Sequence, residues 1–206
     1  MSRSDEPIVL ATGNVHKFQE ISGILSEYRI AIEQRNIKPL EIQSDSLEEI
    51  VTAGINQIAC PEHGAVLVED SGLFIDSLKG FPGPYSSYVY RTLSNVGILR
   101  LMSGAESRRA CFKSVLAFLG KDDAFVMFQG SVVGRISEAV IGSEGFGFDP
   151  IFIPDEGDGR TFGQMCTSEK NELSHRAKAT RRFAAWYSSI RGIPCDLQPS
   201  DKSDNT

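Results

Sequence analysis

The sequence predicts an α/β fold with a mixed, elongated central sheet flanked by helices. Three features carry this prediction: strand-like and helical patterns alternate in the first third of the chain, two long strand-like runs form a hairpin in its middle, and a long helical segment closes it. The 206 residues are 41% hydrophobic and 23% charged, which is enough for one domain or for two small lobes that share a sheet.

The first predicted strand leads directly into a helix. Residues 8–11 are apolar and run into Gly13-Asn14, as a buried strand does where it enters a loop. The next segment is predicted to be helical because its apolar residues fall on one face: Val15, Phe18, Ile21, Ile24 and Leu25. Residues 28–34 then alternate in the manner of a strand.

A second helix is predicted to begin at Ser46, a residue type that caps helix N-termini well. Glu48 and Glu49 lie in its first turn, where we interpret them as solvated charges that favour the helix dipole. The apolar residues of this segment recur at helical spacing: Leu47, Ile50, Val51, Ile55 and Ile58. Residues 66–68 then form another buried strand.

The second half of the chain is predicted to be rich in strands. The sequence GFPGPYS indicates a turn, and residues 95–102 indicate a short helix. Residues 108–120 and 124–137 form a hairpin around residues 121–123. A Gly-punctuated apolar segment covers residues 145–154, and the last helix runs from about Ser174 to residue 191.

Composition excludes several classes of protein. The net charge of −6 argues against a general polyanion binder, so we expect no nucleic acid partner. No apolar run approaches the ~20 residues that span a bilayer, and the N-terminal MSRSDEP lacks a signal-peptide core, so we expect a cytoplasmic protein without membrane contact. Four scattered cysteines indicate reduced thiols and no zinc knuckle.

We expect residues 1–193 to form a single two-lobed domain, because no repeat, low-complexity block or long linker interrupts them. The polar tail of residues 194–206 is expected to be disordered.

The stretch VLVEDSGLFID places two adjacent acids, Glu69 and Asp70, where two apolar runs meet. One interpretation is a solvated turn, because Asp-Ser-Gly is good turn chemistry. The other is a metal or acid/base site at the end of a strand, since Mg²⁺ takes oxygen ligands from one or two carboxylates and from substrate phosphates. Glu41 is the third acid that could join such a site.

The stretch ATGNVHK suggests a phosphate site. A strand that enters a short loop and then a helix leaves backbone N–H groups free to hold an anion. Thr12 and Asn14 can add side-chain donors, and Lys17 lies on the first helical turn. The alternative is a plain strand-to-helix turn with a surface lysine, and His16 is interpreted as facing solvent.

The stretch GFGFDP suggests a base site. Its glycines allow close approach of a ligand, while Phe146 and Phe148 face opposite ways, so that one enters the core and the other can stack on a nucleobase. Asp149 precedes proline, which predicts an extended backbone and a side chain that addresses a base edge. The alternative is two core phenylalanines around a bulge.

The stretch SEKNELSHR is the fourth segment with candidate site residues. Ser174 is predicted to cap the last helix, with His175 and Arg176 in its first turn and Lys170 just upstream. Cations at a helix N-terminus oppose the dipole, which hints at an anionic or carbonyl partner. An exposed basic helix start is the alternative.

Together and in this order, TGNVHK, LVEDSG, GFPGPYS, GFGFDP and SEKNELSHR resemble the inosine triphosphate pyrophosphatase family, also called the HAM1-like or nonstandard purine NTP pyrophosphatases. The segments GFPGPYSSYVYRT and FKSV are most similar in sequence to those of archaeal members. The resemblance implies two lobes around a deep nucleotide-binding cleft, a homodimer, and Mg²⁺-dependent hydrolysis of ITP, dITP or XTP to the monophosphate and pyrophosphate.

The resemblance also assigns roles to residues. It implies that Asp70 is catalytic and that Glu41, Asp70 and Glu69 address the metal. The implied substrate-binding residues are Thr12, Gly13, Asn14, Lys17, Ser71, Phe146, Gly147, Phe148, Asp149, Lys170, His175 and Arg176. One position departs from the family, because Gly54 stands where many members carry a lysine near the phosphates.

Two rival functions remain open at the level of sequence. One is a pyrophosphatase for other modified nucleotides, and the other is a nucleotide-binding module without turnover.

Four aromatic residues near GFPGPYS are too many for so short a segment to bury, which favours a homodimer interface there. They are Phe81, Tyr85, Tyr88 and Tyr90.

Overall fold

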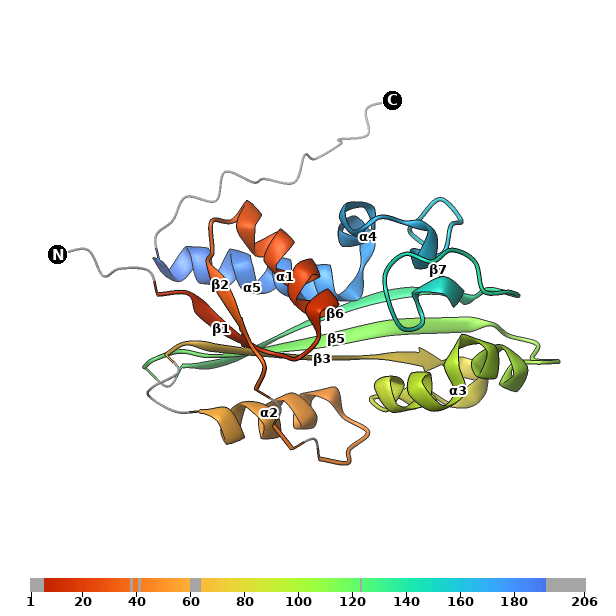
Figure 1. The fold of residues 1–206 in the computed structure, drawn as a ribbon, viewed down its shortest axis with the longest axis horizontal. Coiled ribbons are helices and arrows are strands. Elements are labelled where there is room, and N and C mark those ends of the chain that lie inside the picture. Colours follow the sequence, from red (N-terminus) through yellow and green to blue (C-terminus); the bar gives the residue numbers. More distant parts are fainter. Residues whose placement is uncertain (1–5, 38, 41, 60–63, 123, 192–206) are drawn as a thin grey trace, which may run out of the picture.

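The computed structural model describes residues 6–37, 39–40, 42–59, 64–122 and 124–191. Its strands form one seven-stranded sheet in the order β2-β1-β3-β5-β6-β7, with β4 paired to β3 (Figure 1). The strands are β1 (Ile8–Ala11), β2 (Ile32–Arg35), β3 (Val66–Ile75), β4 (Pro82–Gly83), β5 (Arg109–Leu119), β6 (Phe125–Ile136) and β7 (Phe152–Pro154). β1 runs parallel to β2 and β3, while the other pairs are antiparallel, so the predicted mixed α/β sheet is confirmed.

Helices cover both faces of this sheet. They are α1 (Val15–Glu27), α2 (Leu47–Ile58), α3 (Ser86–Leu101), α4 (Thr167–Leu173) and α5 (His175–Arg191). In Figure 1, α1, α4 and α5 lie on one face, and α2 and α3 lie on the other. The two-lobed shape, the cleft and the boundaries of a single domain stay predictions, and the tail of residues 194–206 lies outside the described residues.

Alternation along the strands divides the core between the two faces. Leu10 and Leu67 pack under α1 and α5, whereas their neighbours Val9, Val66 and Val68 pack against α2. A third apolar cluster lies at the other end of the sheet, where α3 and β7 pack on the long strands; it includes Leu73, Ile75, Val89, Ile98, Phe112, Phe152 and Phe162.

Most of the elements predicted from periodicity are confirmed. α1 and α2 begin where expected, β5 and β6 form the hairpin, and the Oγ atom of Ser174 accepts the N–H of Ala177 to cap α5. α3 begins at Ser86, before the predicted short helix, and continues through a kink at Ser94. α4 was not predicted, because its seven residues are too short to show a helical period.

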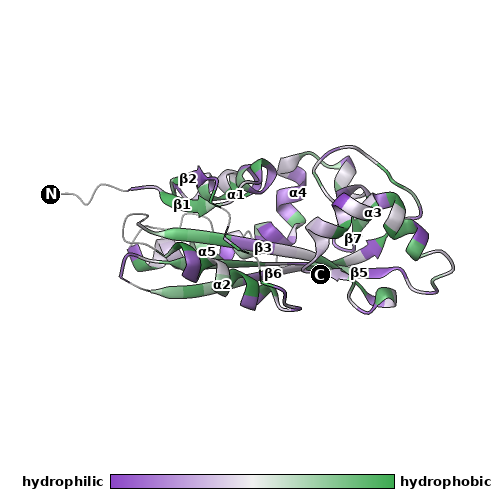
Figure 2. Cartoon of the chain, turned by 60° about the horizontal axis from the view of Figure 1, so that its bottom comes forward, coloured by the Kyte–Doolittle hydropathy of each residue, from purple (hydrophilic) through white to green (hydrophobic). Residues whose placement is uncertain are grey.

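The interpretation of VLVEDSG as a turn or a strand end is wrong. β3 continues for ten residues through Glu69 and Asp70, because β5 pairs with it residue by residue from Val66 to Ile75. Gly72 serves close packing here, since a Cβ atom at this position would lie 2.2 Å from the carbonyl oxygen of Gly83 on β4. β3 is apolar at both of its ends and polar between them, and Figure 2 shows its apolar start giving way to the polar stretch.

Among the described residues, the edge of β3 that faces away from β5 pairs with other strands only near its two ends. β1 pairs with it at Val66 and Leu67, and β4 pairs at Leu73 and Phe74. Within the described chain, no strand pairs with this edge at residues 69–72. The sheet therefore opens beside Glu69 and Asp70, at the point where β1 ends and the chain turns into α1.

None of the described helices is long and apolar enough to cross a membrane.

Gly130 on β6 tests how closely α5 packs on the sheet. A Cβ atom there would lie 2.0 Å from the carbonyl oxygen of His175 and 2.5 Å from the backbone nitrogen of Ala179. We expect Gly130→Ala to lower the free energy of unfolding by about 1–3 kcal/mol, because α5 must move away from the strand. Urea denaturation measures this change.

Gly23 in α1 provides the matched control. A Cβ atom there meets only the side chain of Asn171, at 3.7 Å. Gly23→Ala should raise stability by up to about 1 kcal/mol, because alanine favours a helix interior. A Gly130→Ala protein as stable as the wild type would contradict the close contact between α5 and β6.

Candidate active site

Glu69 and Asp70 sit at the opening in the sheet and point to opposite faces of it. Glu69 is buried on the α1 and α5 side, where its Oε1 accepts the Ser114 hydroxyl at 2.7 Å. Asp70 is more accessible, with its side chain 25% exposed. The two adjacent acids therefore have different environments, and only Asp70 can be reached from solvent without displacing packed groups.

Lys17 spans the two acids. Its Nζ lies 3.0 Å from Oε2 of Glu69 and 3.4 Å from Oδ1 of Asp70, and it donates to the carbonyl oxygen of Glu69 at 3.2 Å. This last bond uses the open edge of β3. Burial would lower the pKa of Lys17, but the charges of Glu69 and Asp70 outweigh it and raise the pKa. The ammonium group is therefore firmly charged.

Arg176 joins Glu69 to the rest of the site. Its Nε lies 3.1 Å from Oε1 of Glu69, its Nη1 donates to Oε2 of Glu20 at 2.6 Å, and its Nη2 donates to the hydroxyl of Ser71 at 2.7 Å. Only 1% of Arg176 is exposed. The guanidinium group is thus hydrogen-bonded through Nη1 and Nη2, while Nε contributes an ion pair without a hydrogen bond.

Glu20 and Lys170 extend this row of charges toward the predicted base site. Lys170 donates to Oε1 of Glu20 at 2.7 Å and to Oδ2 of Asp149 at 2.6 Å, and all three side chains are buried. The contacts form one chain of alternating sign: Asp149, Lys170, Glu20, Arg176, Glu69, Lys17 and Asp70. We call these seven residues the ion row.

The pKa values within the ion row follow from burial and neighbouring charge. Burial would raise the pKa of Glu69, but Arg176 and Lys17 hold it far below its usual value. Burial would also raise the pKa of Glu20, but the charges of Arg176 and Lys170 outweigh burial and lower it. Burial raises the pKa of Asp149, and Lys170 offsets only part of that rise.

Phe146 lies above the ion row on a tightly held loop. Gly145 and Gly147 adopt φ values of 69° and 62°, which favour glycine, and the N–H of Phe146 donates to Oδ2 of Asp149 at 2.8 Å. Nζ of Lys170 lies 4.8 Å from the ring centroid and Cζ of Arg176 lies 5.3 Å from it. The ring is therefore a fixed, electron-rich surface beside two cations.

His175, the residue before Arg176, is buried. Its ring stacks on Phe112 with centroids 4.6 Å apart and an interplanar angle of 8°. Burial and the charges of Arg176 and Lys170 lower its pKa well below the usual value. Its Nδ1 atom is buried without a hydrogen-bond partner among the described residues.

The loop of residues 12–14 is more self-contained than predicted. Oδ1 of Asn14 accepts the N–H groups of His16 and Lys17, and Oγ1 of Thr12 accepts the N–H of Asn14. Asn14 is therefore the N-cap of α1. An anion that uses these backbone donors has to compete with the caps.

The structure brings most of the predicted residues together. Phe148 is in the core and packs edge-on against Tyr90, which confirms that the two phenylalanines of GFGFDP face different ways. The extended backbone predicted for Asp149 is wrong, because it begins the 3₁₀ helix Asp149–Ile151, and its carboxylate is buried against Lys170. Glu41 lies outside the described residues.

Sequence patterns missed two contributors. Glu20 belongs to the apolar face of α1, and its role appears only when α4 and α5 pack against that face. His16 is exposed, as predicted, but its ring stacks on Phe146. No pattern within the sequence reports contacts between segments so far apart.

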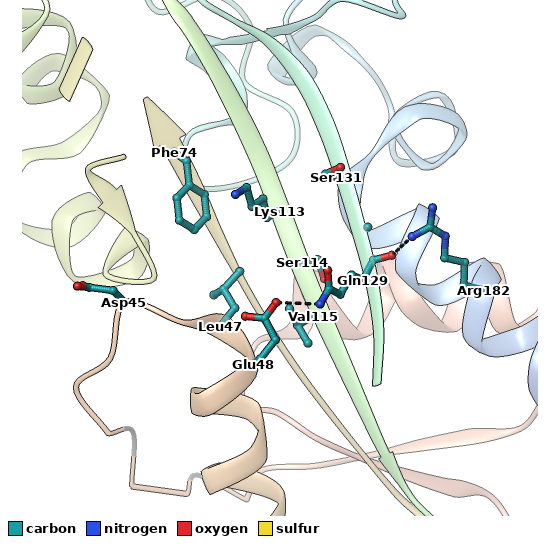
Figure 3. Close-up of a pocket in the computed structure, with 11 residues that line it drawn as sticks. Asp45, Leu47, Glu48, Phe74, Lys113, Ser114, Val115, Gln129, Ser131 and Arg182 are labelled. Atoms are coloured by element: carbon teal, nitrogen blue, oxygen red, sulfur yellow. Dashed lines mark hydrogen bonds between the residues drawn. The ribbon is translucent and has the colours of Figure 1, made fainter. Parts of the chain in front are cut away.

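A separate cavity of about 280 Å³ lies on the α2 face of the sheet (Figure 3). Its charged and amide lining residues are Asp45, Glu48, Lys113, Gln129 and Arg182. Acids and cations balance there, and Gln129 links Glu48 to Arg182 by hydrogen bonds. None of the predicted site residues lines it, so the ion row and Phe146 remain the candidate site.

Among the described residues, no group of three or more histidine, cysteine or acidic side chains is arranged to hold a metal ion. Oε1 of Glu69 accepts the Ser114 hydroxyl and pairs with Arg176, whereas Oε2 lies 3.0 Å from Nζ of Lys17 and makes no hydrogen bond among the described residues. The role of Glu69 at a metal stays a prediction, whereas the exposed part of Asp70 suits a single ligand.

Fold and site together define an α/β protein with a row of paired ions in an opening of its sheet, beneath an aromatic platform. The model of the Ham1 family matches residues 8–186. The chain belongs to the Ham1 family, as its motifs predicted.

Relatives from archaea are similar over most of their length. The "dITP/XTP pyrophosphatase" of Methanopyrus kandleri is 49% identical over 180 residues, which cover 87% of this chain and 95% of that protein. The protein of the same name from Pyrococcus horikoshii is 49% identical over 179 residues, with the same coverage of both chains.

Solved structures of related proteins share the fold. The Staphylococcus aureus Ham1 protein has a TM-score of 0.76 at 27% identity, covering 90% of this chain and 100% of its own. A "nucleoside-triphosphatase / dITP/XTP pyrophosphatase" from Mycobacterium abscessus has a TM-score of 0.66 at 27% identity, covering 88% and 98%.

The pH dependence of stability tests the ion row. The folded pKa of Glu69 lies below the unfolded value of 4.5, so its carboxylate stabilises the fold fully above pH 4.5 and progressively less as pH falls. At pH 7, Glu69→Gln should lower the free energy of unfolding by about 3–5 kcal/mol, because Arg176 and Lys17 lose their shared anion. The difference should shrink below pH 4.5.

Glu138→Gln is the control, since 84% of that side chain is exposed and its ion pair with Arg108 contributes little. Urea denaturation of the three proteins between pH 3 and pH 7 provides the measurement. A Glu69→Gln effect as small as that of Glu138→Gln would mean that the ion row does not hold the fold together.

Proposed function

We propose that this chain hydrolyses nonstandard purine nucleoside triphosphates, dITP, XTP and ITP, to the nucleoside monophosphate and pyrophosphate. The ion row is the single observation that carries the proposal, because it connects an aromatic platform suited to a base with an accessible carboxylate and a lysine suited to phosphates. Relatives named dITP/XTP pyrophosphatase support the same reaction.

The phosphate end of the proposed site comprises Lys17, Asp70, Ser71 and the loop Thr12-Gly13-Asn14. Lys17 would bind phosphate oxygens and neutralise the charge that develops on them in the transition state. Asp70 would orient the attacking water and accept its proton. The water oxygen forms the new bond to phosphorus as the phosphoric anhydride bond breaks, and pyrophosphate leaves.

We propose Mg²⁺ as the cofactor. Its preference for one or two carboxylates plus substrate phosphates fits Asp70, whose side chain is partly exposed beside Lys17, with Glu41 as the second ligand expected from the family. A bound Mg²⁺ supplies charge neutralisation and polarises phosphoryl oxygens. Glu69 would act indirectly, by fixing the position of Lys17.

The base end comprises Phe146 with Gly147, Phe148 and Asp149 beside it, and the buried Lys170, His175 and Arg176. A purine would stack on Phe146. Hypoxanthine and xanthine carry a carbonyl acceptor at position 6, where adenine carries a donor. Donors from Arg176, His175 or a backbone N–H would then be left unpaired by adenine, at about 1–3 kcal/mol per group. Backbone near Phe148 would crowd the 2-amino group of guanine.

Turnover of a nucleotide panel tests this proposal. Purified protein with Mg²⁺ should release pyrophosphate rapidly from ITP, dITP and XTP and slowly from ATP and GTP. Preference for a modified pyrimidine or methylated nucleotide would favour the first rival function, and tight binding without pyrophosphate release would favour a binding module.

Asp70→Asn tests the chemical step. The amide preserves shape but removes the proton acceptor, so kcat should fall about 10²–10⁴-fold while the fold remains intact. Asp76→Asn is the matched control, because Asp76 is an exposed acid just beyond the same strand. Pyrophosphate release by Asp70→Asn at the wild-type rate would remove Asp70 from the mechanism.

We also propose that the chain forms a homodimer through the region of β4 and α3. The four aromatic residues predicted for the interface are all exposed, and Tyr88 is 62% exposed. The same helix exposes Leu93, Val96 and Leu101. Grouped aromatic and aliphatic side chains on one helix are typical of an interface between subunits.

Light scattering at micromolar concentration should give the mass of a dimer. Tyr88→Glu should shift the protein toward the monomer, since it places a charge in the proposed apolar contact. Ile190→Glu, at a residue 59% exposed near the end of α5, should leave the dimer intact. A monomeric wild-type protein would refute the proposal.

A further inference from the structure

The imidazole of His16 lies on the ring of Phe146. The ring centroids are 5.3 Å apart and the planes differ by 14°, which is a stacked arrangement. His16 is exposed on the first turn of α1, and within the described chain its ring makes no hydrogen bond. Stacking on Phe146 is therefore what holds this side chain in place.

Phe146 itself has little freedom to move. Its N–H is bound by the buried carboxylate of Asp149, and the next carbonyl along the loop, that of Gly147, accepts Nδ2 of the buried Asn95 at 3.2 Å. Lys170 and Arg176, which lie near the ring, are also buried. The part of the ring environment that can change readily is the part that His16 occupies.

We propose that His16 covers the base platform in the empty enzyme and is displaced when a purine stacks on Phe146. This inference rests on the proposed function, in which Phe146 carries the base. An imidazole and a purine are both flat, and they cannot occupy the same area of one ring. The histidine thus acts as a competitor within the protein.

Displacement is favoured over insertion of the base between the two rings. Insertion would require the rings to separate by about another 3.4 Å, the thickness of one stacked base. The backbone of α1 resists such a shift, because Asn14 caps its first turn and Lys17 and Glu20 anchor it to the ion row. Rotation of an exposed side chain breaks only the stacking contact.

The stack of His16 on Phe146 should weaken the affinity for nucleotides and leave the selectivity between bases unchanged. When only a fraction of molecules has the platform free, the apparent dissociation constant of any stacking ligand rises by the inverse of that fraction. This factor is the same for every base, because the fraction of molecules with a free platform is a property of the ligand-free protein. His16 therefore controls KM, and the groups around the base control selectivity.

His16→Ala removes the competing ring and keeps a residue that favours a helix. We expect KM for dITP and for XTP to fall by the same factor, roughly two- to tenfold, with kcat unchanged. Gln19→Ala, another exposed position on α1, is the control and should change neither constant. In a Phe146→Ala background, His16→Ala should have no further effect on KM.

A rise in KM for His16→Ala would overturn the proposal, because it would mean that His16 helps to hold the base. An unchanged KM would overturn it as well, since the stack would then not compete with substrate. Unequal changes for dITP and XTP would show that His16 takes part in selection instead.

Proton NMR separates this inference from the proposed function. In the ligand-free protein, the ring current of Phe146 should shift the Cε1 proton of His16 upfield, and the shift should vanish in Phe146→Ala. Addition of IMP should also abolish it. Failure to hydrolyse any triphosphate would refute the proposed function alone, whereas a His16 resonance that IMP leaves unchanged would refute the cover.

Discussion

The structure of the site depends on one interaction, the ion row in the opening of the sheet. A buried ion that loses its partner costs several kcal/mol, so each charge must be neutralised by its neighbours. The alternation of sign from Asp149 to Asp70 meets this requirement along the whole row. Because the charges come from α1, β3, α4, α5 and the 3₁₀ helix Asp149–Ile151, the row also fixes these elements relative to one another. The cost of burying ions is thus offset by mutual pairing, and the result is a positioned set of functional groups.

The opening itself follows from strand lengths. β1 ends after four residues, while β3 continues for ten. The edge of β3 that β1 leaves free lies next to the first turn of α1, so that Lys17 can donate to a backbone carbonyl that a neighbouring strand would otherwise occupy. Adjacent residues of a strand face opposite sides, which buries Glu69 in the ion row and leaves Asp70 accessible. One strand therefore supplies both a structural acid and a candidate catalytic acid.

The aromatic platform depends on the same row. Asp149 is bound to Lys170 through the oxygen that also accepts the N–H of Phe146, so the base-binding loop is tied to the charges below it. Burial raises the pKa of Asp149, and its one cation in the row, Lys170, offsets only part of that rise, whereas the two cations beside Glu20 outweigh burial and lower its pKa. The first turn of α1 contacts both ends of the site, because His16 stacks on Phe146 at the base end and Lys17 contacts Asp70 at the phosphate end.

The sequence by itself determined the elements whose patterns are local. Helical periods defined α1 and α2, Ser46 and Ser174 marked helix starts, and the hairpin of β5 and β6 followed from two strand-like runs around a short turn. The tertiary structure decided that β3 passes straight through Glu69 and Asp70, because a partner strand supplies hydrogen bonds that local turn propensity does not foresee. It also decided the role of Glu20, whose contact with Lys170 joins residues 150 positions apart. Periodicity reports the backbone and one face of an element, whereas the pairing of buried charges depends on which elements the fold brings together.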